Sequence, residues 1–457
     1  MNRRAFLRKT LAGVAAVQCV GLAGTGVPRA WGADIDGYKA IVCVFLLGGL
    51  DNHDVLIPTD TAGYQQWSSI RQSLLAVQGQ TRTQASLLPL GSSNSGSSLA
   101  LGLAPELSGI HSLYNQGRAG IVANVGPLVQ PTTKQTFEEE SVLLPPRLFS
   151  HNDQQSVWQA SAPEGAQYGW GGQFADAVIA AGANEAAEFT TVTSLGNELF
   201  LTGQVAKPYQ VGVEGAALIE LLEDPDSPAS LKQLLRRHFL ASDADRSNLL
   251  ARDLADAANA GLLANERYNT ATTSAFSFAT HFPTSSLGGQ LRAVAQTIAA
   301  RDALRARRQI FFVGMGGFDT HSAQATSLPM LLRQIDQAVT AFYQSMQELN
   351  LGDRVTLFTA SDFGRTLAVN GDGTDHGWGG HHFVVGDAVN GGMIHGEVPP
   401  STLGHEFDAG GGRLIPGLSV EQYASPIGRW FGLGDAEIST ALPNRANFSS
   451  EPALMLG

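Results

Sequence analysis

An α/β architecture, with a mostly parallel sheet flanked by helices, is indicated by three features of the sequence. Several short apolar runs are rich in β-branched residues, which is typical of strands buried on both faces. A long helical pattern lies between two of these runs. The 457 residues are 43% hydrophobic and 15% charged, a composition typical of globular proteins with a large core.

Five runs predict strands of one sheet: residues 38–47, 120–125, 309–313, 355–359 and 383–386. From Leu328 to Leu349, apolar residues recur at steps of three or four, which predicts an amphipathic helix. The strands at 309–313 and 355–359 then form a βαβ unit with this helix. Residues 91–98 are a polar Gly/Ser/Asn stretch with no capacity to form a core, which favours a surface loop.

The domain organisation follows from these runs and from a change of pattern in the middle of the chain. Between residues 212 and 308 the apolar spacing is helical and strand-like runs are absent, which predicts a helical insertion or cap. Residues 34–211 and 309–457 are then the two parts of the α/β domain. The basic stretches Arg236-Arg237 and Arg305 to Arg308 lie in the insertion and are interpreted as solvated helix faces, with anion binding as the alternative.

The N-terminus has the features of a twin-arginine signal peptide. Arg3 and Arg4 precede Phe6 and Leu7, a weakly apolar Ala/Gly-rich stretch follows, and small residues lie near Ala33. The stretch is shorter than the roughly 20 residues of a membrane span. We therefore expect residues 1–33 to direct export of the folded protein to the periplasm or beyond, with no stable membrane span.

The charge of the chain argues against nucleic-acid binding. The formal net charge is −12, and without residues 1–33 the 24 basic and 41 acidic residues give −17. Binding to phosphate backbones depends on clustered Lys and Arg, which a body of this charge does not offer. Cys43 is the single cysteine after the leader, so an internal disulfide is not expected.

Acidic residues and histidines follow the predicted strands. Asp51 comes after the first run, Asp319 and His321 follow the run at 309–313, and Asp362 follows the run at 355–359. His376 precedes the last run. Each Asp alone is compatible with a helix cap or turn, but the carboxyl ends of parallel strands meet at one edge of a sheet. Several carboxylates at this edge would repel one another unless a cation were bound, and mixed carboxylate and imidazole donors favour zinc, manganese or iron over calcium.

At these positions the chain resembles a known bacterial family. The residues that carry the resemblance are Gly48-Gly49-x-Asp51, Gly317 to His321, Ser361 to Thr366, Gly373 to Gly377, and Gly391-Gly392 with Gly396. They look like the twin-arginine-exported domain of unknown function 1501 family, which is placed in the alkaline phosphatase and sulfatase superfamily. The resemblance extends to about Gly432 and implies an alkaline-phosphatase-like fold with one or two divalent metal ions.

The resemblance also implies roles for individual residues. Asp51, Asp319, His321, Asp362 and His376 match metal-ligand positions of the superfamily. Phe363 stands where the superfamily often supplies a ligand, so one of the two metal positions is weakened or lost. The superfamily's hydrolases need a nucleophile at a helix N-terminus, for which Ser150 is the candidate. Ser150 also fits a helix cap with Asp153, and His151 fits a ligand or a residue that contacts a ligand.

Two further side chains near these motifs have two interpretations each. Arg365 is expected either to clamp the oxygens of a phosphate or sulfate ester through its planar fork, or to pair with Asp362 or a neighbouring carboxylate. Trp378 is a substrate platform or a packing residue. His53, His381, His382 and His395 are expected to be structural histidines.

The leading hypothesis is an exported metal-dependent hydrolase that cuts a small anionic phosphate or sulfate ester, with Ser150 and Arg365 as catalytic residues. A non-catalytic periplasmic metal- or ligand-binding or assembly protein is the alternative. A metal-dependent isomerase or transferase would use the same constellation of residues.

Overall fold

The computed structural model describes residues 33–91, 99–196, 199–217, 222, 226–240 and 249–456. The predicted signal peptide therefore lies outside the described residues except for Ala33. The predicted polar loop at 91–98 also lies outside them, except for Gly91.

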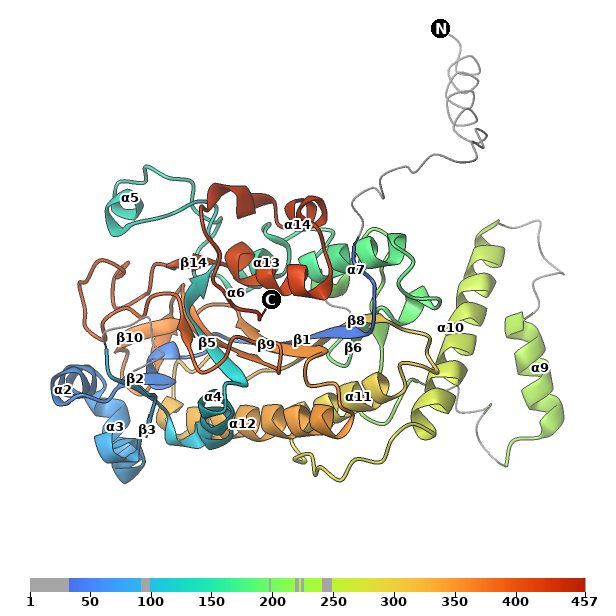
Figure 1. Cartoon of the computed structure of the whole chain (residues 1–457), viewed down its shortest axis with the longest axis horizontal. Helices are drawn as coiled ribbons and strands as arrows, with labels where there is room; N and C mark the ends of the chain where they lie inside the picture. Colours follow the sequence, from blue (N-terminus) through green and yellow to red (C-terminus); the bar gives the residue numbers. More distant parts are fainter. Residues whose placement is uncertain are drawn as a thin grey trace, which may run out of the picture. The chain divides into compact units, whose positions relative to one another are not determined.

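A nine-stranded mixed sheet forms the centre of the fold (Figure 1). The strand order is β13 (Ile394–His395), β5 (Ala119–Gly126), β12 (Gly380–Val385), β9 (Val355–Ser361), β1 (Lys39–Leu46), β8 (Arg308–Met315), β6 (Thr191–Thr193) and β7 (Tyr209–Gln210), with β14 (Leu418–Ser419) also paired to β5. All pairs are parallel except those of β12, which runs antiparallel to both β5 and β9. The predicted mostly parallel sheet is confirmed.

The predicted strands and the long helix are all present. Each of the five apolar runs lies in or overlaps one of β1, β5, β8, β9 and β12, and the helix is α12 (Gln324–Glu348). In the β8–α12–β9 unit both strands pair with β1, which lies between them: Val42 is in register with Phe311 on one side and Leu357 on the other. The antiparallel direction of β12 is the one departure, because an apolar run marks burial on both faces but not strand direction.

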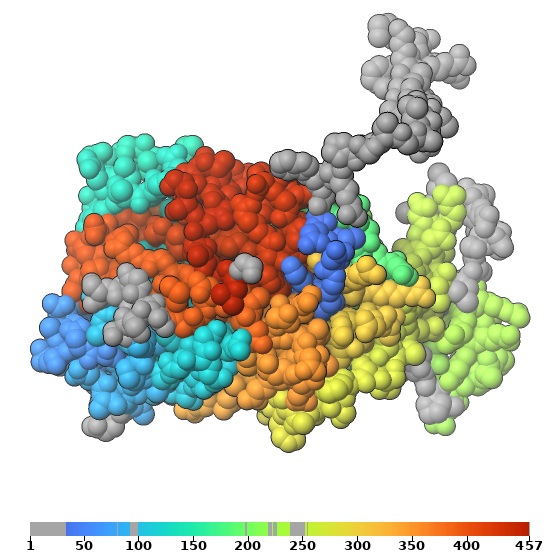
Figure 2. Space-filling model, viewed as in Figure 1, coloured from blue at the N-terminus to red at the C-terminus, as the bar shows by residue number. Residues whose placement is uncertain are grey.

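Helices cover both faces of the sheet, as Figure 1 shows. Alternate residues of β1 point to opposite faces, so Val42 and Val44 pack in one core cluster while Cys43 and Phe45 pack in the other. The first cluster includes residues of α4 (Ser108–Asn115), α11 (Ser286–Ala299) and α12, and the second includes residues of α7 (Trp170–Ala180), α13 (Val420–Phe431) and α14 (Asp435–Ala441). In Figure 2 the C-terminal segment, in red, covers the upper side of this view, and the yellow and orange segments cover the lower side.

The remaining elements lie around this sandwich. The described part of residues 212–308 contains α9 (Ala229–Leu240), α10 (Leu249–Thr273) and α11. α9 packs on α10, whereas α11 places Leu287, Leu291 and Val294 in the core beneath the sheet. No helix in the described ranges combines the length and apolarity needed to cross a bilayer. The other helices and strands are α2 (Thr61–Ile70), α3 (Gln72–Gln78), α5 (Lys134–Glu138), α6 (His151–Ala160), the small sheet of β2 (Leu56–Pro58), β4 (Leu101–Leu103) and β3 (Leu88–Pro89), and the pair β10 (Arg365–Val369) and β11 (Thr374–His376).

Three histidines are buried where the sheet meets its loops. Burial lowers the pKa of His53 to about 3, of His381 to about 4 and of His382 to about 3. His53 contacts the Gly412 carbonyl, and His381 accepts from the Asn124 amide. His382 packs edge-on against Trp158, and its Nδ1 has no partner in the described part of the chain. Their burial is compatible with the structural role that the sequence predicts for most histidines near the motifs.

We predict that His382→Leu makes the free energy of unfolding depend less on pH below neutrality. Between pH 6.5 and pH 4 the unfolded chain binds a proton at His382 that the folded protein does not, so stability falls as the pH falls. Each such proton contributes about 1.4 kcal/mol per pH unit. Urea unfolding of the variant at pH 5 and pH 7 should show a smaller difference in free energy than the wild type, with the exposed His281→Leu as control. An unchanged difference would contradict this.

Candidate metal centre

The carboxyl ends of β1, β8 and β9 lie at one edge of the sheet, because these strands are parallel neighbours. The loops that follow them approach one another closely. Gly48 has a φ of 114°, and a Cβ atom there would lie 2.4 Å from the backbone nitrogen of Asp319. A glycine at position 48 is therefore required for the loop after β1 to lie against the loop after β8.

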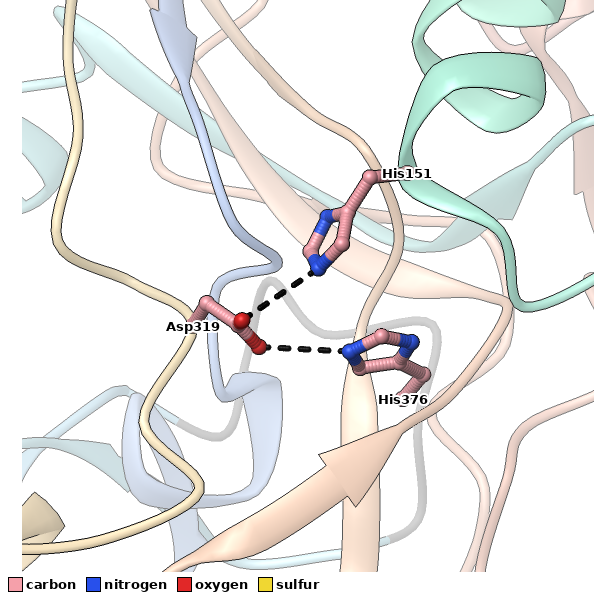
Figure 3. Close-up of side chains that lie close together, drawn as sticks. All are labelled: His151, Asp319 and His376. Atoms are coloured by element: carbon pink, nitrogen blue, oxygen red, sulfur yellow. Dashed lines mark hydrogen bonds and ion pairs between the residues drawn. The ribbon is translucent and has the colours of Figure 1, made fainter.

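Three side chains from separate elements converge at this edge (Figure 3). His151 is the first residue of α6, Asp319 lies in the loop after β8, and His376 ends β11. Nε2 of His151 lies 3.4 Å from Oδ2 of Asp319, and Nε2 of His376 lies 3.2 Å from Oδ1. Among the described residues, these three form the group of possible metal ligands, with one donor atom from each within 4.8 Å of the others.

The tautomers of the two histidines follow from their other contacts. Nδ1 of His376 lies 2.7 Å from the Phe149 carbonyl oxygen, which can only accept, so Nδ1 carries the proton. Nδ1 of His151 lies 2.6 Å from Oδ2 of Asp362, and a carboxylate also accepts. When the rings are neutral, both Nε2 lone pairs therefore face the oxygens of Asp319. Such contacts between acceptors are repulsive unless a cation lies between them.

The two rings differ in how readily they take a proton instead. The hydrogen bond to Asp362 is the main reason that the pKa of His151 is raised. Burial lowers the pKa of His376. A proton at Nε2 would thus compete with a metal mainly at His151, while His376 is held in the neutral form that ligates metals.

His321 approaches the same carboxylate from the exposed side. Its Nε2 lies 3.0 Å from Oδ1 of Asp319 and 2.9 Å from Nε2 of His376. Its Nδ1 lies 3.3 Å from Oδ1 of Asp375, and about 44% of its side chain is exposed. His321 is therefore adjacent to the group as a further imidazole donor.

Arg365 is fully buried and its guanidinium is used within the protein. Nη1 donates to Oδ1 of Asp319 at 2.6 Å and to the Gly48 carbonyl at 3.1 Å, while Nε and Nη2 donate to the hydroxyl and carbonyl of Thr374. Burial alone would raise the pKa of Asp319, but the hydrogen bond and charge of Arg365 bring it below its usual value. Of the two predicted arrangements, the pairing with a neighbouring carboxylate is the one observed, and that carboxylate is Asp319.

Asp51 lies apart from the group. Both of its oxygens accept from Arg71, and it also accepts from Gln324 and from the His53 amide. Burial favours the neutral carboxyl, but the charge of Arg71 outweighs it and lowers the pKa of Asp51. The partner Arg71 was not found by sequence reasoning, because it lies between α2 and α3 in no recognisable motif.

Asp362 and Phe363 both contact the histidines. Asp362 is fully buried, and its Oδ2 accepts from Nδ1 of His151 and from Nε2 of Gln155, at 2.6 and 2.9 Å. The buried ring of Phe363 lies 4.9 Å from the ring of His151 and 4.7 Å from that of His376, measured between centroids. At the position where the resemblance implies a ligand, the ring of Phe363 thus packs against two histidines.

Ser150 occupies the N-cap position of α6, next to His151. Its hydroxyl donates to Oδ2 of Asp153 at 3.0 Å and caps no backbone amide.

The side chain of Trp378 is fully buried and donates to the Pro127 carbonyl, which makes it a packing residue. Arg413 lies near the group, donating to the His376 carbonyl at 2.8 Å.

Comparison with known proteins places these residues in a family. The model of the family described as "Protein of unknown function (DUF1501)" matches residues 38–408. No curated protein matches the sequence. Similar solved structures include Ps i-CgsB in complex with k-i-k-neocarrahexaose (10% identity, 91% of this chain and 78% of that chain, TM-score 0.34) and the lipoteichoic acid synthase LtaP from Listeria monocytogenes (9%, 93% and 79%, 0.33). The PsFucS1 sulfatase from Pseudoalteromonas sp. is a third (8%, 88% and 68%, 0.33). These likenesses are too distant to assign an activity.

We predict that Asp51→Leu destabilises the fold by about 3 to 5 kcal/mol, because it leaves the buried charge of Arg71 without a counter-ion. Urea unfolding measures the loss. The double variant Asp51→Leu with Arg71→Met is the matched control and should regain much of the stability. If Asp51→Leu instead keeps its stability and loses bound metal, Asp51 is a ligand.

Proposed function

The chain belongs to the DUF1501 family of proteins of unknown function, and we propose that it is an exported metal-dependent hydrolase of phosphate or sulfate esters. The observation that carries the proposal is the set of Nε2 atoms of His151 and His376 facing the Asp319 carboxylate while their Nδ1 atoms are held by acceptors. This arrangement is favourable when a cation occupies the point of convergence.

The donor atoms fit a transition metal ion. In the proposed centre His151, Asp319 and His376 hold one divalent ion, and His321 is adjacent as a fourth donor. Two or three imidazoles with one carboxylate favour zinc or manganese over calcium, which prefers oxygen ligands alone. Asp51 is not a ligand in this proposal, because Arg71 neutralises it and occupies both of its oxygens.

The charges around the centre suit an anionic substrate once an ion is bound. Asp319 pairs with Arg365, while Asp362, Asp375 and Arg413 each contact one of the histidines, which leaves one net negative charge from these five groups. A divalent cation reverses the sign to one net positive charge. An ester with a phosphate or sulfate group would then be attracted to the edge of the sheet.

The chain's own residues have defined roles in the proposed reaction. A divalent ion, when bound, supplies Lewis-acid polarisation of a phosphoryl or sulfuryl oxygen. Ser150 is the proposed nucleophile. It lies at the N-terminus of α6, where the helix dipole favours an alkoxide, and its hydroxyl donates a hydrogen bond to Asp153. Arg365 orients Asp319 rather than the substrate, because four hydrogen bonds to the protein use its guanidinium.

Export is part of the proposal and is supported by the paired Arg3 and Arg4 and the stretch that follows them. Fractionation of cells that express the full chain tests it, since the mature protein is expected outside the cytoplasm and a variant with both arginines replaced by lysine is expected to remain inside.

We predict that the purified protein contains about one divalent ion per chain and hydrolyses an aryl phosphate or aryl sulfate. His376→Ala should lose the ion and the turnover while remaining folded, because its side chain is partly exposed at the surface of the site. Metal analysis, circular dichroism and a chromogenic ester panel measure the three quantities. The exposed His281→Ala is the control for loss of a histidine. Wild-type protein without metal would overturn the proposal.

The second candidate is a metal-binding protein without hydrolytic activity, which is favoured because hydrogen bonds within the protein use the Arg365 guanidinium. We predict that Ser150→Ala keeps its metal but loses turnover, because only the nucleophile is removed. Activity of Ser150→Ala equal to the wild type would exclude Ser150 as nucleophile. Stoichiometric metal in the wild type with no turnover of any ester in the panel would favour the binding protein.

A further inference from the structure

We infer that Asp362, together with Gln155, is a positioning residue that fixes the ring of His151 with Nε2 toward Asp319, and that Asp362 does not itself bind the metal. The inference rests on the proposed metal centre and deepens it. It gives Asp362 a role different from the ligand role that the sequence resemblance implied.

The first support is the way one oxygen of Asp362 is used. Oδ2 accepts from Nδ1 of His151 at 2.6 Å and from Nε2 of Gln155 at 2.9 Å. His151 and Gln155 are four residues apart on α6, so they lie on the same face of the helix. One carboxylate oxygen thus ties the first turn of α6, and the imidazole that it carries, to the end of β9.

The second support is the choice of nitrogen. A ring that donates from Nδ1 to a carboxylate presents its lone pair at Nε2. The same carboxylate also makes Nε2 a stronger donor to a metal. Nε2 of His151 is the atom that faces Asp319, at 3.4 Å. The adjacent ring of Phe363, 4.9 Å away between centroids, limits rotation of the imidazole.

The third support is what distinguishes Asp362 from Asp319. Asp362 is not a member of the group of close donor atoms among the described residues, which contains His151, Asp319 and His376. The side chain of Asp319 is about 44% exposed, whereas that of Asp362 is fully buried. His151 thus lies between a partly exposed carboxylate at Nε2 and a buried carboxylate at Nδ1.

A double-mutant cycle on cobalt affinity tests the inference, with competition by a chromophoric chelator as the measurement. Asp362→Ala should weaken cobalt binding by about 10- to 100-fold, and Asp362→Asn should weaken it less, because the amide oxygen still accepts from Nδ1. In the background of His151→Ala, the change at Asp362 should have no further effect. Equal losses in Asp362→Ala and Asp362→Asn that add to the loss in His151→Ala would show a ligand and overturn the inference. The exposed Asp353→Asn is the control.

A readout that needs no metal separates this inference from the proposed function. Nitrogen NMR of the metal-free protein, at alkaline pH where the rings are neutral, should find the proton of His151 on Nδ1 in the wild type and in Asp362→Asn. A proton on Nε2 in the wild type would overturn the positioning role. Absence of cobalt uptake by the wild type would overturn the proposed metal centre, while the NMR result still decides whether Asp362 fixes the ring.

Discussion

The arrangement at the edge of the sheet depends on the carboxylate of Asp319. It accepts from the buried Arg365 at 2.6 Å, and the Nε2 atoms of three histidines lie within 3.4 Å of it. Arg365 in turn bonds to the loop after β1 and to Thr374 in β11. A single ion pair therefore sets the distances between the loops after β1 and β8 and the strand that carries His376. Loss of that pair would release Asp319 from the Arg365 guanidinium that also binds the loop after β1 and Thr374.

Further buried ion pairs lie around this site, and they fix loops that the strands of the sheet do not fix by themselves. Arg71 joins Asp51 to the Thr366 carbonyl in β10, and Arg82 joins Asp54 to Glu106. Buried pairs contribute little net stability when compared with well-packed apolar residues, but breaking one is costly. Their consequence here is geometric: the loop after β1 is fixed on both sides, and its carboxylates are neutralised by the protein. The carboxylates that contact the histidines directly are those of Asp319, Asp362 and Asp375.

The sequence predicted the fold better than it predicted the site, for a physical reason. Apolar runs report burial, and five of them located strands of the central sheet, whereas they do not encode strand direction, and β12 runs antiparallel to both of its neighbours. Strand order and the carboxyl edge likewise brought Asp319 and His376 together as expected. The partner of each charged group is set by side-chain packing, which periodicity does not encode. For this reason the sequence predicts Asp51 as a ligand although Arg71 binds it, and it does not decide whether His151 is a ligand or a residue that contacts a ligand.

Phe363 illustrates how packing can replace ligation at such a site. A ligand at this position would add a donor beside Asp362, but the phenyl ring instead contacts the imidazoles of His151 and His376 and lies where Gly49 leaves room, since a Cβ on Gly49 would come within 2.5 Å of it. The ring excludes water from one side of both histidines, which strengthens their hydrogen bonds to Asp362 and to the Phe149 carbonyl. Two rigidly held imidazoles bind a metal with less loss of side-chain entropy than two mobile ones. In the proposed centre Phe363 thus supplies packing where a second ion would need a donor, and Gly49 leaves the space that the ring occupies.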